Sequence, residues 1–225
     1  MSPSDSIRAI VFDFDGTLVD SNAVKRNAYD AAFARHPGAP VHIRQTLARY
    51  RDRDRHFIIR AVARRLVNAG QIAPEQLERV CWSATRRYSW FCRTHVEVAP
   101  DFRGVGAALA ALSRRYSLAI NSGTPERQLR FLVRKRRWGR RCSLVYGAPS
   151  SKLANLQRIA RKLNLEPRQM ALVGDSDLDA SAAMRFGCLF IHAGVGETSP
   201  LRGALSIRTM KDLPRLTRRL STSRA

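Results

Sequence analysis

The stretch AIVFDFDGT at residues 9–17 decides the fold. Its first four residues are a short apolar run, which predicts a buried β-strand. The run stops at Asp13, and a second carboxylate follows at Asp15, with a glycine and a threonine behind it. In an open α/β sheet, the chemistry lies outside the carboxyl ends of the strands. We therefore predict that both acids line a loop at the end of this strand.

Asp13 and Asp15 are close enough in sequence for their charges to repel. One of them would be pushed toward protonation unless a cation or a reacting proton holds the pair. A divalent metal resolves this conflict. With Mg²⁺ bound, Asp13 can stay ionised as a nucleophile, while Asp15 can protonate a leaving group and then act as a base toward water. A solvated Asp-x-Asp-Gly turn is the alternative for this segment taken alone.

A second apolar run, residues 118–121, ends in Ser122, Gly123, Thr124 and Pro125. Thr124 is expected to be a helix N-cap and Pro125 the first helical residue. Ser122 and Gly123 would then lie just before a helix N-terminus, where backbone N–H groups, the helix dipole and a hydroxyl can bind phosphate. An ordinary turn is the alternative for these four residues.

Lys152 is one of only five lysines among 40 basic residues. It follows a loop of Gly, Pro and Ser residues and opens a helical pattern that reaches about Leu163. A lysine in this position can offer a compact positive charge to a phosphoryl oxygen. A solvated residue at the start of a helix is the alternative.

The fourth motif is an apolar run at residues 170–174 that ends in Gly174 and is followed by Asp175 and, four residues later, Asp179. The glycine permits close backbone approach, and carboxylates are the ligands that hard cations prefer. An acidic N-cap would explain a single acid here, but it explains the whole set poorly.

Four strand-end motifs in this order resemble those of the haloacid dehalogenase-like superfamily of hydrolases, and the resemblance covers essentially the whole chain. Within the superfamily, the chain is similar to the phosphatase branch with a helical cap after the first motif, the branch of the phosphoglycolate phosphatases. The resemblance implies that Asp13 is the nucleophile that becomes an aspartyl-phosphate, and that Asp15 is the general acid and base.

The resemblance also assigns the other motifs by position. Ser122 and Gly123 would bind the transferring phosphoryl group, and Lys152 would steady both the nucleophile and the phosphate. The implied Mg²⁺ ligands are Asp13, the backbone carbonyl of Asp15 and Asp175, with Asp179 as a supporting acid. An acid two residues after the nucleophile suits phosphatases and phosphomutases and argues against dehalogenation.

The chain length of 225 residues suits one sizeable core with a small appendage. Strands are expected near residues 8–13, 116–121, 143–146, 170–174 and 187–192. With helices between them, they predict an α/β fold, a Rossmann-like doubly wound parallel sheet. The catalytic core would comprise residues 1–19 and 99–225, and residues 20–98 would form an inserted, all-helical cap.

The cap is expected to contain helices at residues 22–35, 43–51, 56–69 and 74–94. Trp82, Trp90 and Phe91 fall in the last, apolar-rich helix, and we expect them in the cap core rather than in a base-stacking platform. A cap that closes over the site would select the substrate and exclude water.

The charge balance is the one feature that the resemblance does not explain. The formal net charge is +22, and residues 127–141 contain eight cations and no acid. A basic face attracts polyanions, so nonspecific binding to nucleic acid or to a membrane surface is one alternative. However, Leu129, Leu132 and Val133 mark an ordinary core stripe, and the excess charge is spread over the chain. Specific nucleic-acid recognition is therefore not expected.

The cysteines at 81, 92, 142 and 188 lack the paired spacing of zinc or redox sites, which favours reduced thiols in a cytoplasmic protein. No apolar run reaches membrane-spanning length and no leader pattern opens the chain, so no membrane insertion is expected. We expect a monomer or a homodimer.

The motifs together predict a Mg²⁺-dependent phosphatase that hydrolyses a small phosphorylated metabolite, a phosphomonoester, through an aspartyl-phosphate. Two alternatives stay open. One is a phosphomutase of the same superfamily, similar to β-phosphoglucomutase. The other is a basic polyanion-binding protein with a vestigial site.

Overall fold

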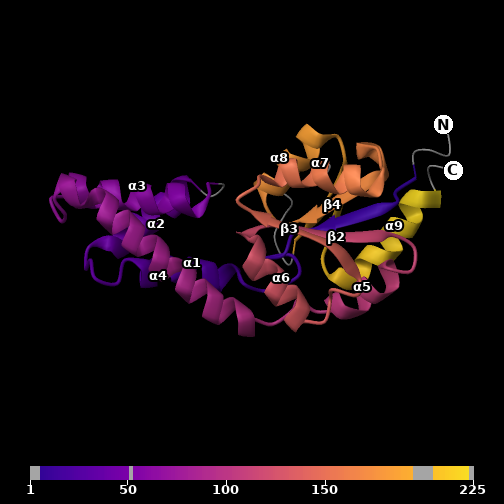
Figure 1. Cartoon of the computed structure of the whole chain (residues 1–225), viewed down its shortest axis with the longest axis horizontal. Coiled ribbons are helices and arrows are strands. Elements are labelled where there is room, and N and C mark those ends of the chain that lie inside the picture. Colours follow the sequence, from indigo (N-terminus) through magenta and orange to yellow (C-terminus); the bar gives the residue numbers. More distant parts are fainter. Residues whose placement is uncertain (1–5, 51–52, 195–204, 223–225) are drawn as a thin grey trace. The chain divides into compact units, whose positions relative to one another are not determined.

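The structure, a computed structural model, describes residues 6–50, 53–194 and 205–222. The chain divides into two compact units, which we call the core unit (residues 1–20 and 100–225) and the cap unit (residues 21–99). Each unit is described by itself below (Figure 1). Among the described residues, no helix combines the length and the apolarity that crossing a bilayer requires.

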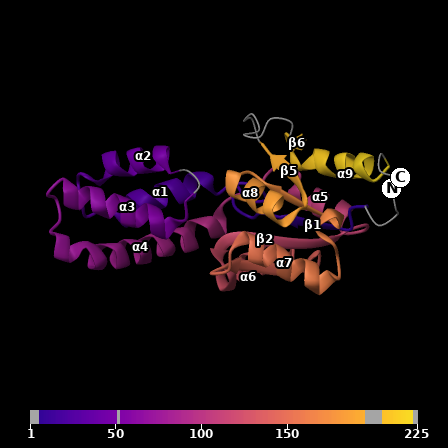
Figure 2. The same ribbon diagram turned by 90° about the horizontal axis from the view of Figure 1, so that it is seen from above.

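The core unit is built on a six-stranded sheet with the order β3-β2-β1-β4-β5-β6, in which all neighbouring strands are parallel (Figure 2). The strands are β1 (Ala9–Phe12), β2 (Ser117–Pro125), β3 (Cys142–Ala148), β4 (Met170–Gly174), β5 (Leu189–Ala193) and β6 (Leu205–Ile207). The predicted Rossmann-like, doubly wound sheet is confirmed. Strand β6 was not predicted, because a three-residue strand with a serine at its centre leaves no apolar run to detect.

Helices cover both faces of this sheet. Figure 1 shows α7 (Lys152–Leu163) and α8 (Asp177–Phe186) on one face, and α5 (Val105–Leu112), α6 (Glu126–Lys135) and α9 (Leu213–Thr222) on the other. Every residue of β1 and β4 is buried. Burial on both faces explains why these two strands read as continuous apolar runs in the sequence.

Strand β2 is longer than its apolar run. It continues through Ser122 to Pro125, which pairs with Ala148 of β3, and α6 begins only at Glu126 with Pro125 as its N-cap. The prediction of Thr124 as N-cap and Pro125 as first helical residue is therefore wrong. The Thr124 hydroxyl donates to a side chain of another strand end instead of accepting from a helix N–H.

The two linkers between the units pair with each other within the core unit. Val19 forms an antiparallel bridge with Asp101, and the Asp20 N–H donates to the Pro100 carbonyl at 2.9 Å. The Phe102 N–H donates to the carbonyl of Leu18 at 3.0 Å. The chain therefore leaves and re-enters the core unit at one point.

The cap unit, in its described part, consists of helices and contains no strand. Its helices are α1 (Asn22–Ala32), α2 (Ala39–Arg49), α3 (Arg55–Asn68), the short 3₁₀ helix η2 (Pro74–Gln76) and α4 (Leu77–Val98). Each lies within a few residues of an expected helix; α2 starts four residues early because Pro40 suits the first turn of a helix. Arg51, the last residue of the expected second helix, lies outside the described residues.

Helix α4 packs in the cap through a stripe of small and apolar side chains spaced four residues apart: Val80, Ala84, Tyr88, Cys92 and Val96. Trp82 and Trp90 lie off this stripe and are 62% and 57% exposed. Their expected place in the cap core is therefore wrong, because helical phase and not hydrophobicity alone decides which residues are buried. The Arg86 guanidinium covers the Trp82 ring, 4.6 Å from its centroid. Phe91, the third expected core residue, is only partly buried.

Candidate active site

The topology brings the four motifs to one edge of the sheet. Strand β1 lies between β2 and β4, and its last residue, Phe12, pairs with Ile120 and Val173. The residues that follow these partners therefore meet at the same edge. The strand order reverses beside β1, between β1 and β4, and such switch points are where open α/β sheets bind their ligands.

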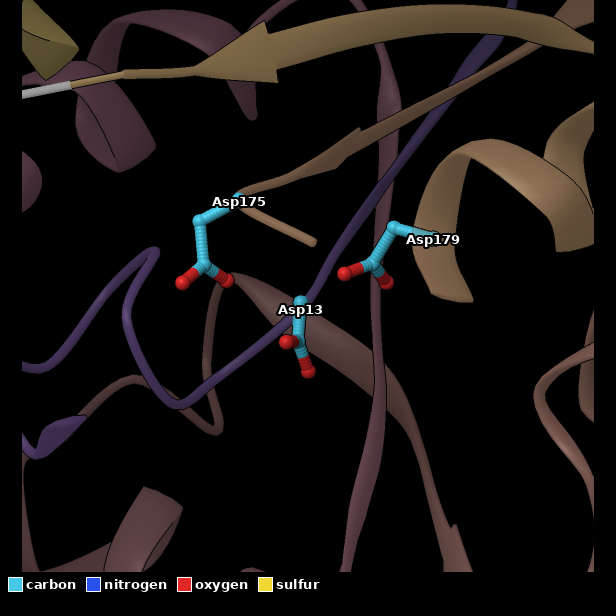
Figure 3. A group of neighbouring side chains, drawn as sticks. All are labelled: Asp13, Asp175 and Asp179. Carbon is cyan, nitrogen blue, oxygen red and sulfur yellow. The ribbon is translucent and has the colours of Figure 1, made fainter. Parts of the chain in front are cut away.

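Three carboxylates meet at this edge. Asp13 follows β1, Asp175 follows β4, and Asp179 lies in the first turn of α8; one oxygen from each lies within 4.8 Å of the others. Figure 3 shows Asp175 and Asp179 on either side of Asp13. Asp13 and Asp179 are buried, and Asp175 is partly buried. Carboxylate oxygens gathered in this way are the ligands that Mg²⁺ prefers.

Asp13 itself offers an open coordination position. Its Oδ1 atom is buried and has no hydrogen-bond partner in the described part of the chain. Burial raises the pKa of Asp13, and the neighbouring carboxylates of Asp179, Asp175 and Asp15 raise it further against the attraction of Lys152. A cation beside Asp13 would satisfy the orphaned oxygen and stabilise the ionised carboxylate. The donor set therefore fits a divalent metal.

Lys152 partly balances this negative charge. Its Nζ lies 3.0 Å from Asp13 Oδ2 and 2.5 Å from Asp179 Oδ1. Burial alone would lower the pKa of Lys152, but the two carboxylates raise it well above its ordinary value. The side chain therefore stays protonated and lies beside the proposed nucleophile.

Two buried asparagines, which the sequence reasoning missed, fix the backbone of Lys152. Asn121, the last residue of the second apolar run, donates from Nδ2 to the Lys152 carbonyl at 2.8 Å. Asn155 donates from Nδ2 to Asn121 Oδ1 at 3.1 Å. A polar residue at the end of an apolar strand was the signal for Asn121. Asn155 carries no such signal in the sequence; it lies three residues beyond Lys152, on the buried side of α7.

Asp179 can approach β4 because residue 174 is glycine. A Cβ at Gly174 would lie 2.4 Å from Asp179 Cγ, a distance at which one of them must move. The Asp179 carboxylate is completely buried and accepts from the Ser176 hydroxyl as well as from Lys152. The expected close approach to the backbone at Gly174 is therefore that of the Asp179 side chain, which occupies the space that a Cβ would fill.

Asp15 has a different environment from Asp13. Its Oδ2 accepts from the hydroxyls of Thr124, at 2.7 Å, and Ser122, at 3.2 Å. Thr124 was not singled out as a site residue, because its expected role was that of a helix cap. Gly123 lies between these two hydroxyl residues, and a Cβ there would meet no atom within 4 Å. The end of β2 thus provides the Ser122 hydroxyl, an unobstructed backbone at Gly123 and two hydrogen bonds that orient the Asp15 carboxylate.

Comparison with known proteins agrees with this geometry. The family model of the haloacid dehalogenase-like hydrolases matches residues 7–187. The chain belongs to this family. Phosphoglycolate phosphatase of Chromobacterium violaceum is 29% identical over 217 residues, which cover 92% of this chain and 95% of that protein. The predicted haloacid dehalogenase-like phosphatase is confirmed by the family match and by this relative.

Two solved structures share the fold of this chain. A predicted phosphoglycolate phosphatase from Haemophilus somnus has a TM-score of 0.75 at 18% identity, covering 96% of this chain and 99% of that one. A haloacid dehalogenase-like family protein from Streptococcus pneumoniae has a TM-score of 0.70 at 19% identity, with coverage of 93% and 98%. At these identities the likeness shows the fold, and the choice of substrate rests on the site.

Proposed function

We propose that this protein is a Mg²⁺-dependent phosphatase that hydrolyses a small phosphomonoester through an aspartyl-phosphate on Asp13. The observation that carries the proposal is the contrast between two neighbouring carboxylates. Asp13 lies beside Lys152 and has a buried oxygen with no hydrogen-bond partner among the described residues, whereas the hydroxyls of Ser122 and Thr124 both donate to a single oxygen of Asp15. The first arrangement suits a nucleophile, and the second suits a proton carrier held in place.

In the first step, an Asp13 oxygen attacks phosphorus and the bond from phosphorus to the ester oxygen breaks. Asp15, protonated at this stage, gives its proton to the leaving oxygen. In the second step, Asp15 as a carboxylate takes a proton from water, the water oxygen bonds to phosphorus, and the bond to Asp13 breaks. Inorganic phosphate leaves, and both side chains return to their starting states.

The surrounding residues position the phosphoryl group. Ser122 Oγ, the Gly123 N–H and Lys152 Nζ would contact its oxygens and offset their charge. The Mg²⁺ ion would be held by Asp13, the carbonyl of Asp15 and Asp175, with Asp179 supporting Lys152. When bound, the ion would supply positive charge that stabilises the ionised nucleophile and offsets the charge of the phosphoryl oxygens.

Phosphoglycolate is the first substrate to test, because the relative from Chromobacterium violaceum carries that name. The proposed compartment is the cytoplasm. All four cysteines of the chain are free thiols in the structure, which suits a reducing environment.

The proposal is tested by measuring phosphate release from an aryl phosphate and from phosphoglycolate, with and without Mg²⁺. Wild type is compared with Asp13→Asn at equal folded concentration. Metal-dependent release that disappears in the variant supports the aspartyl-phosphate route. Release that survives in Asp13→Asn, or that does not respond to Mg²⁺ and a chelator, would overturn it.

A further inference from the structure

The cap unit contains a second place where charged side chains gather, and the proposed hydrolysis makes no use of it. A pocket of about 410 Å³ opens between the segment after α1 and one face of α4. This volume lies within the range of small-molecule sites, roughly 300–1,000 Å³. The lining residues all belong to the cap unit: Arg35, His36, Gln76, Arg79, Val80, Ser83 and Arg87.

Helical spacing builds one wall of this pocket. Arg79, Ser83 and Arg87 are four residues apart in α4, so their side chains share one face of the helix. Gln76, just before α4, extends the same face. The opposite wall is formed by Arg35 and His36, which follow the end of α1. Because α1 has 11 residues, this end lies about 16 Å from the start of the helix near the linker.

Arg87 is fixed in place at the junction of the two walls. Its Nε donates to the carbonyl of Ala32, the last residue of α1, at 2.7 Å, and its Nη1 donates to Ser83 Oγ at 2.8 Å. A guanidinium has five N–H donors in one plane, so most of them are left for another acceptor. The group is therefore oriented before any ligand arrives.

Three guanidinium groups line the pocket, and none of the described lining residues is acidic. Glu78, the nearest acid along α4, is engaged by Arg60 through two hydrogen bonds of 2.6 and 2.8 Å. Arg35 and Arg79 form no ion pair with any described residue. Burial and the charge of Arg35 lower the pKa of Arg87. Unbalanced like charges around a pocket favour the entry of an anion.

We propose that this pocket binds a small oxyanion with more than one negative charge, of the phosphate or carboxylate class. Planar guanidinium groups bind the oxygens of both classes through paired hydrogen bonds. The Gln76 amide and the Ser83 hydroxyl, which also line the pocket, add neutral polar groups. A bound anion bridges the segment after α1 to α4, so it stabilises the cap unit by an amount that rises with the logarithm of its concentration once this exceeds the dissociation constant.

Calorimetric titration of the full-length protein without Mg²⁺ tests this inference. The probes are inorganic phosphate, pyrophosphate and citrate, added separately, so that phosphate and carboxylate ligands are distinguished. Because phosphate and pyrophosphate are also expected at the candidate active site, the titrations are repeated in Lys152→Ala. We expect at least one probe to bind the Lys152→Ala protein with one equivalent. If no probe binds this protein, the inference is wrong, whatever the outcome of the phosphatase assay.

The pocket is identified by Arg35→Gln and Arg79→Gln, whose side chains are exposed and make no bond in the described structure. Each is expected to weaken binding roughly tenfold or more. Arg86→Gln is the matched control, since it removes the same charge from the same helix, α4, but the Arg86 side chain lies over Trp82, outside the pocket. Equal weakening in Arg86→Gln would show a general charge effect and overturn the assignment.

Discussion

The core unit and the cap unit each gather charged side chains in one place, but they balance these charges in opposite ways. At the edge of the sheet, Lys152 lies between the carboxylates of Asp13 and Asp179, so the fold itself supplies part of the counter-charge. In the cap pocket, Arg87 is held by a carbonyl and a hydroxyl, and none of the described residues that line the pocket is acidic. The charges at the edge of the sheet are therefore partly balanced without a ligand. The positive charges of the cap pocket would be balanced only when an anion binds.

The largest effect should come from the nucleophile. Asp13→Asn is expected to reduce phosphate release by at least roughly a thousandfold, because an amide cannot form the covalent intermediate. Single-turnover and steady-state assays measure the loss. Circular dichroism and the melting temperature, expected to stay close to wild type, control for folding. A variant that retains more than a small fraction of the rate would remove Asp13 from its proposed role.

The two charged sites should respond differently when one cation is removed from each, and the free energy of unfolding measures the difference. Lys152→Ala leaves two buried carboxylates without their cation and is expected to cost about 3 kcal/mol of unfolding free energy. Arg79→Gln relieves repulsion among like charges and is expected to be neutral or slightly stabilising. Urea denaturation of both variants without Mg²⁺ makes the comparison. If both variants lost a similar amount of unfolding free energy, the proposed difference in charge balance between the two sites would be wrong.

Gly174 tests how tightly the core site is packed. Gly174→Ala places a Cβ against Asp179 and should cost about 1–3 kcal/mol while lowering kcat. Gly106 is the matched control, because a Cβ at this position in α5 would meet no atom within 4 Å. Gly106→Ala is expected to stabilise the protein by about 0.5–1 kcal/mol. Thermal unfolding and phosphatase assays give both values, and equal behaviour of the two variants would argue against the close approach.

Substitutions at Thr124 test whether its hydrogen bond positions Asp15 for catalysis. Thr124→Val removes the hydroxyl that donates to Asp15 at 2.7 Å, whereas Thr124→Ser keeps a hydroxyl. We expect kcat to fall roughly tenfold in the valine variant and to recover in the serine variant, with little change in KM. Initial rates over a range of substrate concentrations separate the two constants. A loss confined to KM would place Thr124 in substrate binding instead.

The smallest expected effect concerns His36 in the cap pocket. Burial and the charge of Arg87 lower its pKa below the ordinary value of 6.5, and Arg35 and Arg79 also line this pocket. The unfolded chain then binds more protons at His36 than the folded one, so its contribution to stability is present above pH 6.5 and is lost as the pH falls. His36→Gln should therefore show a weaker loss of stability between pH 7 and pH 5.5. Denaturation curves at several pH values measure the difference, and identical slopes would contradict it.

Much of the core site could be predicted from the sequence, because three of the four motifs are short apolar runs that end in polar residues. In a parallel sheet such runs are buried on both faces, and their carboxyl ends meet at one edge. The contacts that orient the motifs could not be predicted in this way. Thr124 reads equally well as a helix cap, and Asn155 is found only once the buried side of its helix is known.

The cap shows the complementary limit. Its helices were predicted within a few residues of their ends, but the exposed Trp82 and Trp90 were wrongly expected in its core. A difference of two residues along α4 turns a side chain to the opposite side of the helix. The arginines of the pocket come from two segments that are far apart in sequence, and their meeting depends on how α1 packs against α4.

The paired linkers make the cap unit a single insertion into a loop of the sheet. Because Asp20 and Pro100 are hydrogen-bonded neighbours, the intervening chain begins and ends at the same place on the core unit. The free-energy cost of closing a loop rises only slowly with its length. A cap of another size could therefore replace this one at the same junction without disturbing β1 or β2. The core unit and the cap unit can then be combined as separate modules, in evolution or in the laboratory, by joining the chain at these two linkers.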